Sequence, residues 1–254
     1  MSWAFVLYIL HLKRQKSSTS GKTFPYVLSE KGIIPGVKPH LKVYTLPGTG
    51  GDTVMQGLDS LAVRARDYYV AGARFAKWRS PLSIDVSRGR PTGLAVRANM
   101  HDLARYALIC QSEGLMPIVE PDVSLSGAHT LEEAVSVNVR VQSELFKAMI
   151  DHGVYMGGAT LKPNMINPGK ACLKSYTVEQ IASANVFVLD QSFPVAMRGA
   201  NYLSGGQKLE AACARLNAIN KAKGNRPWNL RSVPILCCMQ ITPEGFNIFL
   251  FILF

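Results

Sequence analysis

Short apolar segments alternate with longer amphipathic segments from about residue 30 to residue 230. The short segments contain few charges and are bounded by glycine or proline, which is the pattern of strands. The strands predicted in this way are IIPGVK (33–38), ARFAKWR (73–79), LMPIVEP (115–121), GATLKP (158–163) and ANYLSGG (200–206).

Between the predicted strands, apolar residues recur every three or four positions, as on one face of a helix. Two of these segments open on a capping box, Thr130 with Glu133 and Thr177 with Gln180, which satisfies free backbone N–H groups at a helix start. The predicted helices cover 59–72, 100–114 and 130–150, and two more begin near 177 and 207.

The alternation of strands with helices predicts right-handed crossovers and a parallel sheet. The last polar residues of the strands, Lys38, Lys77, Glu120, Lys162 and Ser204, are separated by 39, 43, 42 and 42 residues. Three of them stand directly before a proline, which holds the preceding residue extended and cannot continue the sheet ladder. In a parallel barrel, such strand ends meet on one face, where active sites are built. We therefore predict an α/β fold of the (β/α)₈ TIM-barrel family, with a doubly wound open sheet as the alternative.

A lysine at such a strand end has two interpretations. Most lysines are exposed, so Lys162 alone would be a solvated side chain. If Lys38, Lys77 and Lys162 share one mouth, their mutual repulsion and burial lower the amine pKa, and a neutral amine can form a Schiff base with a carbonyl. Glu120 is then the candidate for moving protons, or the salt-bridge partner of one of the lysines, or both. Asp122 offers a second carboxylate that orients a lysine or caps a loop.

The composition favours a globular protein with anionic ligands. The chain has 254 residues, 48% of them hydrophobic, and a formal net charge of +11. Arg79 adds a cation to the predicted mouth, and Ser204 and Gly205 precede a predicted helix start, where backbone N–H groups suit a phosphate. We therefore expect a phosphorylated substrate. No RNA-recognition signature or long basic run supports nucleic-acid binding.

The histidines and cysteines suggest neither a metal site nor a disulfide framework. The five histidines have no metal-ligand spacing, and the five cysteines form no paired pattern, which predicts no metal and reduced thiols. The apolar run from residue 3 to 10 is too short to span a bilayer, and no membrane partner is expected. We divide the chain into an apolar and basic leader (1–20), a barrel domain (21–230) and an apolar tail (231–254).

Several stretches, taken in order, resemble class I fructose-bisphosphate aldolases. They are GKTFPYVLSEKGIIPGVK, QGLDSL, AGARFAKWR, LARYALICQSEGLMPIVEPDV, GATLKPNMINPGKAC, YLSGGQ and LNAINK followed by PW. The resemblance implies a (β/α)₈ barrel that forms a homotetramer and uses no metal or other cofactor. The cysteine pattern favours a cytoplasmic location, with an organelle as the alternative. The implied reaction is the reversible cleavage of fructose 1,6-bisphosphate to dihydroxyacetone phosphate and glyceraldehyde 3-phosphate.

The resemblance also implies a role for each candidate residue. Lys162 in LKPNM would be the Schiff-base lysine and Glu120 in IVEP the general acid and base. Lys77 and Arg79 in FAKWR would contact the substrate near its reacting carbons and a phosphate, and Lys38 would be a further cation. Asp122 stands where the family usually has glutamate, and Ser204 and Gly205 in LSGGQ would bind phosphate.

The resemblance is incomplete. Eight units of this size exceed the 254 residues of the chain, whose first predicted strand resembles the family's third, so we expect roughly strands three to seven. We find no counterpart of the family's first-strand aspartate or of its phosphate-binding arginine after the eighth strand. The stretch after Lys38 also departs from the usual aspartate-lysine pattern. The alternative function is therefore a catalytically impaired or inactive aldolase fragment that acts by binding.

Overall fold

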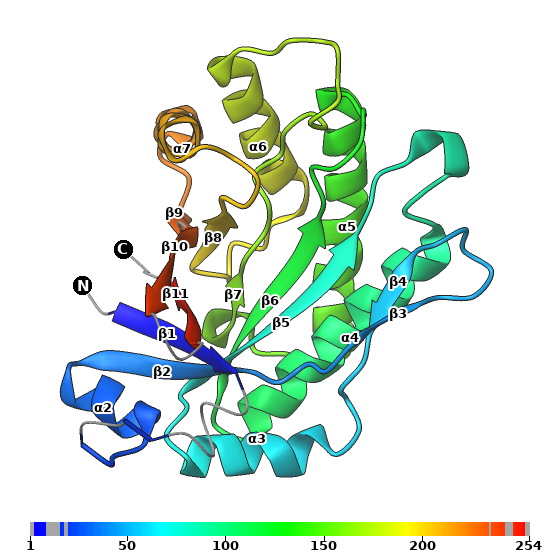
Figure 1. Ribbon diagram of the computed structural model, residues 1–254. Helices are drawn as coiled ribbons and strands as arrows, with labels where there is room; N and C mark the ends of the chain where they lie inside the picture. The colour runs from blue at the N-terminus through cyan, green and yellow to red at the C-terminus, as the bar shows by residue number, and fades with distance from the viewer. Residues whose placement is uncertain (1–2, 9–15, 18–19, 234, 242–245, 252–254) are drawn as a thin grey trace.

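The main body of the protein is one parallel sheet with helices along its outer face (Figure 1). The computed structural model describes residues 3–8, 16–17, 20–233, 235–241 and 246–251. The strands of the sheet lie side by side in the order β1 (Trp3–Tyr8), β2 (Ile33–Lys38), β5 (Phe75–Leu82), β6 (Met116–Val123), β7 (Thr160–Leu161), β8 (Gly199–Leu203) and β9 (Asn229–Val233).

Every neighbouring pair in this sheet is parallel. Successive helices, from the second one onward, pack side by side over the outer face of the sheet (Figure 1). The helices are α2 (Phe24–Glu30), α3 (Leu61–Val70), α4 (Gly93–Ser112), α5 (Leu131–Asp151), α6 (Val178–Ser192) and α7 (Leu209–Lys223), with short 3₁₀ turns at Val86–Arg88 and Met156–Gly158. The other described strands form two antiparallel pairs: β3 (Val43–Thr45) with β4 (Thr53–Met55), and β10 (Ile235–Ile241) with β11 (Phe246–Phe251).

Both predicted capping boxes are present. The Thr130 hydroxyl accepts from the Glu133 N–H while the Glu133 carboxylate accepts from the Thr130 N–H, and α5 begins at the next residue. Thr177 and Gln180 make the same exchange at the start of α6. Each box satisfies donors that the first helical turn leaves without an internal partner.

The core lies between the sheet and the helices. Trp78 of β5 is fully buried and its ring lies 5.3 Å from that of Tyr106 on α4. Because side chains alternate across a strand, Lys77 and Arg79 on either side of Trp78 point to the opposite face, the inner one. The same alternation puts Val119 against the helices and leaves Glu120 on the inner face.

The sheet is curved but open, which confirms the expected incomplete barrel of the α/β class. Among the described residues, β1 and β9 are its two edges and do not pair with each other. Each of these edge strands adds to the five predicted ones, and the antiparallel pair β10–β11 lies beside β1 (Figure 1). The division of the chain at residues 20 and 230 stays a prediction.

The boundaries of two strands differ from those predicted. β7 is only Thr160–Leu161, because a 3₁₀ turn precedes it and Pro163 stands two residues after Leu161. β5 instead continues through Pro81 to Leu82. None of the described helices has both the length and the apolarity required to cross a membrane.

Candidate active site

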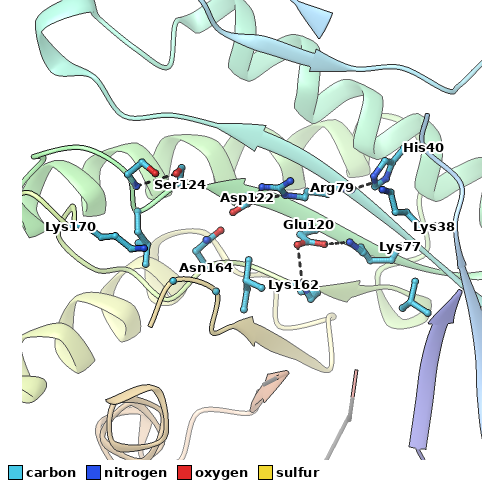
Figure 2. A pocket seen from close by; sticks show the side chains of 16 residues that line it. Lys38, His40, Lys77, Arg79, Glu120, Asp122, Ser124, Lys162, Asn164 and Lys170 are labelled. Carbon is cyan, nitrogen blue, oxygen red and sulfur yellow. Dashed lines mark hydrogen bonds and ion pairs between the residues drawn. The ribbon is translucent and has the colours of Figure 1, made fainter. Parts of the chain in front are cut away.

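The carboxyl ends of β2, β5, β6, β7 and β8 open into one cavity of about 430 Å³. Seven of the eight predicted site residues line it: Lys38, Lys77, Arg79, Glu120, Asp122, Lys162 and Gly205. The eighth, Ser204, is buried directly beside Gly205. Figure 2 shows Lys162, Glu120 and Lys77 at the centre of the cavity, Lys38 at one end and Lys170 at the other.

The centre of the cavity is an ion triad built on three adjacent strands. Glu120 accepts from Lys162 Nζ at 2.9 Å through Oε1 and pairs with Lys77 Nζ at 3.0 Å through Oε2 (Figure 2). All three side chains are at least nine-tenths buried. The backbone N–H of Lys162 donates to the Val119 carbonyl at 2.8 Å, so the parallel pairing of β6 and β7 brings Lys162 and Glu120 together.

The triad shifts the pKa values of its members in a direction that suits nucleophilic chemistry. Burial lowers the pKa of the Lys162 amine, and the nearby charge of Lys77 lowers it further, although Glu120 opposes both. Burial by itself raises the pKa of Glu120, but the ammonium groups of Lys162 and Lys77 outweigh it and hold that pKa below its ordinary value. The site therefore combines an ionised carboxylate with an amine that loses its proton more easily than a solvated lysine.

A second ion pair lies next to the triad on the same strands. The Arg79 Nε and Nη2 atoms both contact Asp122 Oδ2, each at 2.5 Å. The Asp122 side chain is buried, whereas that of Arg79 is 47% exposed. Asp122 thus holds the arginine, in place of the lysine that the sequence suggested, and the guanidinium keeps an open face toward the cavity.

His40 is a cavity residue that the sequence analysis missed. Its Nδ1 accepts from the Arg79 backbone N–H at 3.3 Å, and its ring packs edge-on against Trp78. Burial lowers the pKa of His40 to about 2, with the charges of Lys77, Lys38 and Arg79 adding to the effect. The imidazole is therefore neutral, and its only sequence signal was its position two residues beyond Lys38.

Lys38 lies beside His40 at the same end of the cavity (Figure 2). Burial lowers the pKa of Lys38, and the charges of Lys77 and Arg79 lower it further. This end of the cavity therefore carries a high density of positive charge, which suits an anionic group of a ligand.

The opposite end is formed by loops and was largely missed. Asn164, Lys170, Ser124 and Ser126 line it together with Gly205 and Gly206. Asn164 follows Lys162 by two residues, which was a usable signal, whereas Lys170 lies in a loop with no periodic pattern.

The Ser-Gly-Gly turn is held against the end of β7. The Leu203 N–H donates to the Pro163 carbonyl at 2.8 Å, which fixes the chain just before Ser204. Helix α7 begins at Leu209, two residues later than predicted, so Gly205 lies in the turn before the helix and outside its first turn. Among the described residues, no group of three or more histidine, cysteine, aspartate or glutamate side chains could hold a metal ion.

Known proteins of similar sequence and structure belong to one family. The family model of class-I fructose-bisphosphate aldolase matches residues 6–233. Fructose-bisphosphate aldolases of Echinococcus multilocularis and Dictyostelium discoideum are each 47% identical, over 222 and 210 residues. These matches cover 87% and 83% of this chain but 61% and 58% of the relatives, so the chain spans about three fifths of their length.

A solved structure extends the likeness to the fold. The fructose-bisphosphate aldolase of Plasmodium falciparum, solved with TRAP and a small-molecule inhibitor, is similar with a TM-score of 0.86 and 41% identity, over 90% of this chain and 66% of that one. The fold and the site together define the class of protein: an incomplete α/β barrel with a lysine-rich cavity at the carboxyl ends of its parallel strands. The chain belongs to the class I fructose-bisphosphate aldolase family, which confirms the resemblance, while the roles of the individual site residues stay predictions.

Proposed function

We propose that this chain cleaves fructose 1,6-bisphosphate reversibly into dihydroxyacetone phosphate and glyceraldehyde 3-phosphate through a Schiff base on Lys162. The observation that carries the proposal is the buried Lys162–Glu120–Lys77 triad, placed at the centre of a cavity with a lysine at each end. Family membership supports the same reaction.

The geometry suits each step of the reaction. The Lys162 ammonium passes a proton to the Glu120 carboxylate, and the neutral amine attacks the C2 carbonyl to give a carbinolamine. Glu120 returns that proton to the departing hydroxyl, so that water leaves and a cationic iminium forms. Glu120 then takes the proton of the C4 hydroxyl, the C3–C4 bond breaks, and its electron pair moves into the iminium to give an enamine and free glyceraldehyde 3-phosphate. Protonation at C3 and addition of water release dihydroxyacetone phosphate and restore the amine.

The remaining predicted residues are assigned to binding and positioning. Lys77 holds the Glu120 carboxylate and adds positive charge beside the reacting carbons. Asp122 orients Arg79, whose guanidinium contacts a phosphate together with Lys38. Ser204 and Gly205 bind the other phosphate. The chain takes a phosphorylated sugar as its ligand and uses no metal or other cofactor.

A second function, ligand binding without cleavage, is favoured by one observation. The chain spans about three fifths of the length of its relatives, and its described sheet is open between β1 and β9. The triad by itself is enough to form an iminium, so a protein that does not break the C3–C4 bond could still bind the ketone covalently. We also infer a cytoplasmic location, since two plant relatives are named cytosolic and cytoplasmic, and a homotetramer from the family resemblance.

The test is chemical trapping of the iminium. The purified chain is incubated with dihydroxyacetone phosphate, borohydride is added to reduce the iminium to a stable secondary amine, and the modified lysine is mapped by mass spectrometry. We expect the adduct on Lys162 and none in a Lys162→Met variant, with Lys147→Met as a surface control that keeps the adduct. Cleavage of fructose 1,6-bisphosphate, measured separately, distinguishes the enzyme from the binding protein. If no adduct formed, or if several surface lysines were modified equally, both proposed functions, cleavage and binding without cleavage, would be overturned.

A further inference from the structure

Lys170 differs from the paired cations of the cavity. Lys77 and Lys162 share the Glu120 carboxylate, and Arg79 contacts Asp122. Lys170 also lines the cavity, yet it forms no ion pair with any carboxylate in the described part of the chain. An ammonium group that lacks an internal counter-charge in a basic cavity is suited to an anion supplied by a ligand.

The backbone fixes where Lys170 lies. The N–H groups of residues 169, 170 and 171 donate to the carbonyls of His129, Leu125 and Gly127 at 2.8 to 2.9 Å. The two loops approach so closely at Gly169 that an added Cβ there would lie 2.3 Å from the Gly127 carbonyl oxygen. The base of the Lys170 side chain is therefore held by three hydrogen bonds, although the side chain itself is exposed.

From this position the side chain reaches across to the turn that follows β8. A Cβ built on Gly206 would lie 3.2 Å from Lys170 Nζ, so the ammonium group lies close to the Gly206 backbone. Gly206 has a φ of +81°, a conformation that glycine adopts without strain. Asn164 lies between Lys170 and the triad (Figure 2), and its buried Oδ1 has no hydrogen-bond partner among the described residues.

Strand order decides which part of a ligand reaches this end. β8 is the direct neighbour of β7, and Lys162 follows the last residue of β7. Lys38 lies on β2, which is separated from β7 by β5 and β6. A small ketone joined to Lys162 therefore has the Gly205–Gly206 turn as the nearer anion site, and Lys38 as the more distant one.

We propose that the Lys170 ammonium group, next to Gly206 in the turn after β8, binds the phosphate of the ketone that reacts with Lys162, while Asn164 Oδ1 accepts a hydrogen bond from a hydroxyl of the same ketone. The inference rests on the proposed function, since it takes the ketone phosphate as the ligand. Lys170 then makes the site selective for a phosphorylated ketone over the same ketone without phosphate.

The experiment compares two ketones that differ only in the phosphate. Dihydroxyacetone phosphate and dihydroxyacetone are each titrated against the full chain, and the concentration for half-maximal borohydride trapping on Lys162 is measured. Because one charge-assisted hydrogen bond is worth about a factor of ten, Lys170→Met is expected to raise this concentration about tenfold for the phosphate ester. The value for dihydroxyacetone stays unchanged, and Lys170→Arg restores most of the loss.

The matched control is Lys208→Met, which removes the same charge from an exposed lysine that lies outside the cavity, two residues beyond Gly206. An equal loss in both variants, or an equal loss for both ketones, would overturn the proposal. If the unmodified chain traps neither ketone, the proposed function fails, and binding of inorganic phosphate followed by ³¹P NMR still decides the role of Lys170. Weaker phosphate binding in Lys170→Met than in Lys208→Met supports the role, and equal binding overturns it.

Discussion

The centre of the cavity and its Lys170 end hold positive charge in different ways. At the centre, Lys77 and Lys162 are buried on neighbouring strands and share one carboxylate. At the end, Lys170 is exposed on a loop and has no such partner in the described part of the chain. Removing a charge at the centre therefore leaves a buried ion without its counter-charge, which lowers the stability of the fold. Removing the charge of Lys170 changes only the affinity for the ligand. The centre should control stability and chemistry together, and the end should control selectivity alone.

Glu120→Gln should have the largest effect on stability. The change leaves two buried ammonium groups without their shared carboxylate, so we expect the free energy of unfolding to fall by about 3 kcal/mol or more. Urea denaturation measures the loss. The control is Glu30→Gln, whose carboxylate is 46% exposed and pairs with the exposed Lys22, so that the loss should be much smaller. Equal losses in the two variants would mean that the triad is not held as a buried unit.

Gly169→Ala should act on the Lys170 end and leave the centre intact. The added Cβ meets the Gly127 carbonyl oxygen at 2.3 Å, so the two loops must separate, at a cost of about 1–3 kcal/mol. We expect weaker selectivity for the phosphorylated ketone but continued trapping of dihydroxyacetone on Lys162. Gly93→Ala is the control, because its Cβ would meet only a flexible arginine side chain at 3.4 Å. Loss of all trapping in Gly169→Ala would show that the two regions are not separable.

His40 should make the free energy of unfolding depend on pH. The native pKa of His40 is about 2, while the unfolded chain takes up a proton near the ordinary value of 6.5. The unfolded state therefore binds more protons below pH 6.5, and stability falls as the pH is lowered from there toward 2. His40→Gln should lose about 1 kcal/mol less than the unmodified chain between pH 6.5 and 5.5. Urea unfolding at both pH values measures this, with His101→Gln at a partly exposed position as control; parallel profiles would contradict it.

Arg79→Lys should have the smallest effect. The lysine keeps the charge opposite Asp122 but loses the two-atom contact with Oδ2. Because the Arg79 side chain is about half exposed, we expect the free energy of unfolding to change by less than about 1 kcal/mol. Urea denaturation beside Glu120→Gln gives the comparison. A loss as large as that of Glu120→Gln would place this pair with the buried triad.

The sequence by itself determined the order of the main elements and the centre of the site. Apolar periodicity and capping boxes set the helices, and the regular spacing of Lys38, Lys77, Glu120 and Lys162 placed them at one end of a parallel sheet. These features are local, because strand alternation and helix capping act within a few residues. The family resemblance followed from the same strand-end motifs.

Only the tertiary structure decided which charges pair and which loops meet. The sequence left open whether Glu120 bridges one lysine or two, and it did not suggest that Asp122 holds Arg79. His40 and Lys170 reach the cavity through contacts with Trp78 and with the loop at residues 125–129, and both partners are distant in sequence. The edge strand Trp3–Tyr8 is a short apolar run that only its pairing with β2 defines as a strand. Loop positions and strand pairing depend on hydrogen bonds between distant segments, which no local pattern of residues encodes.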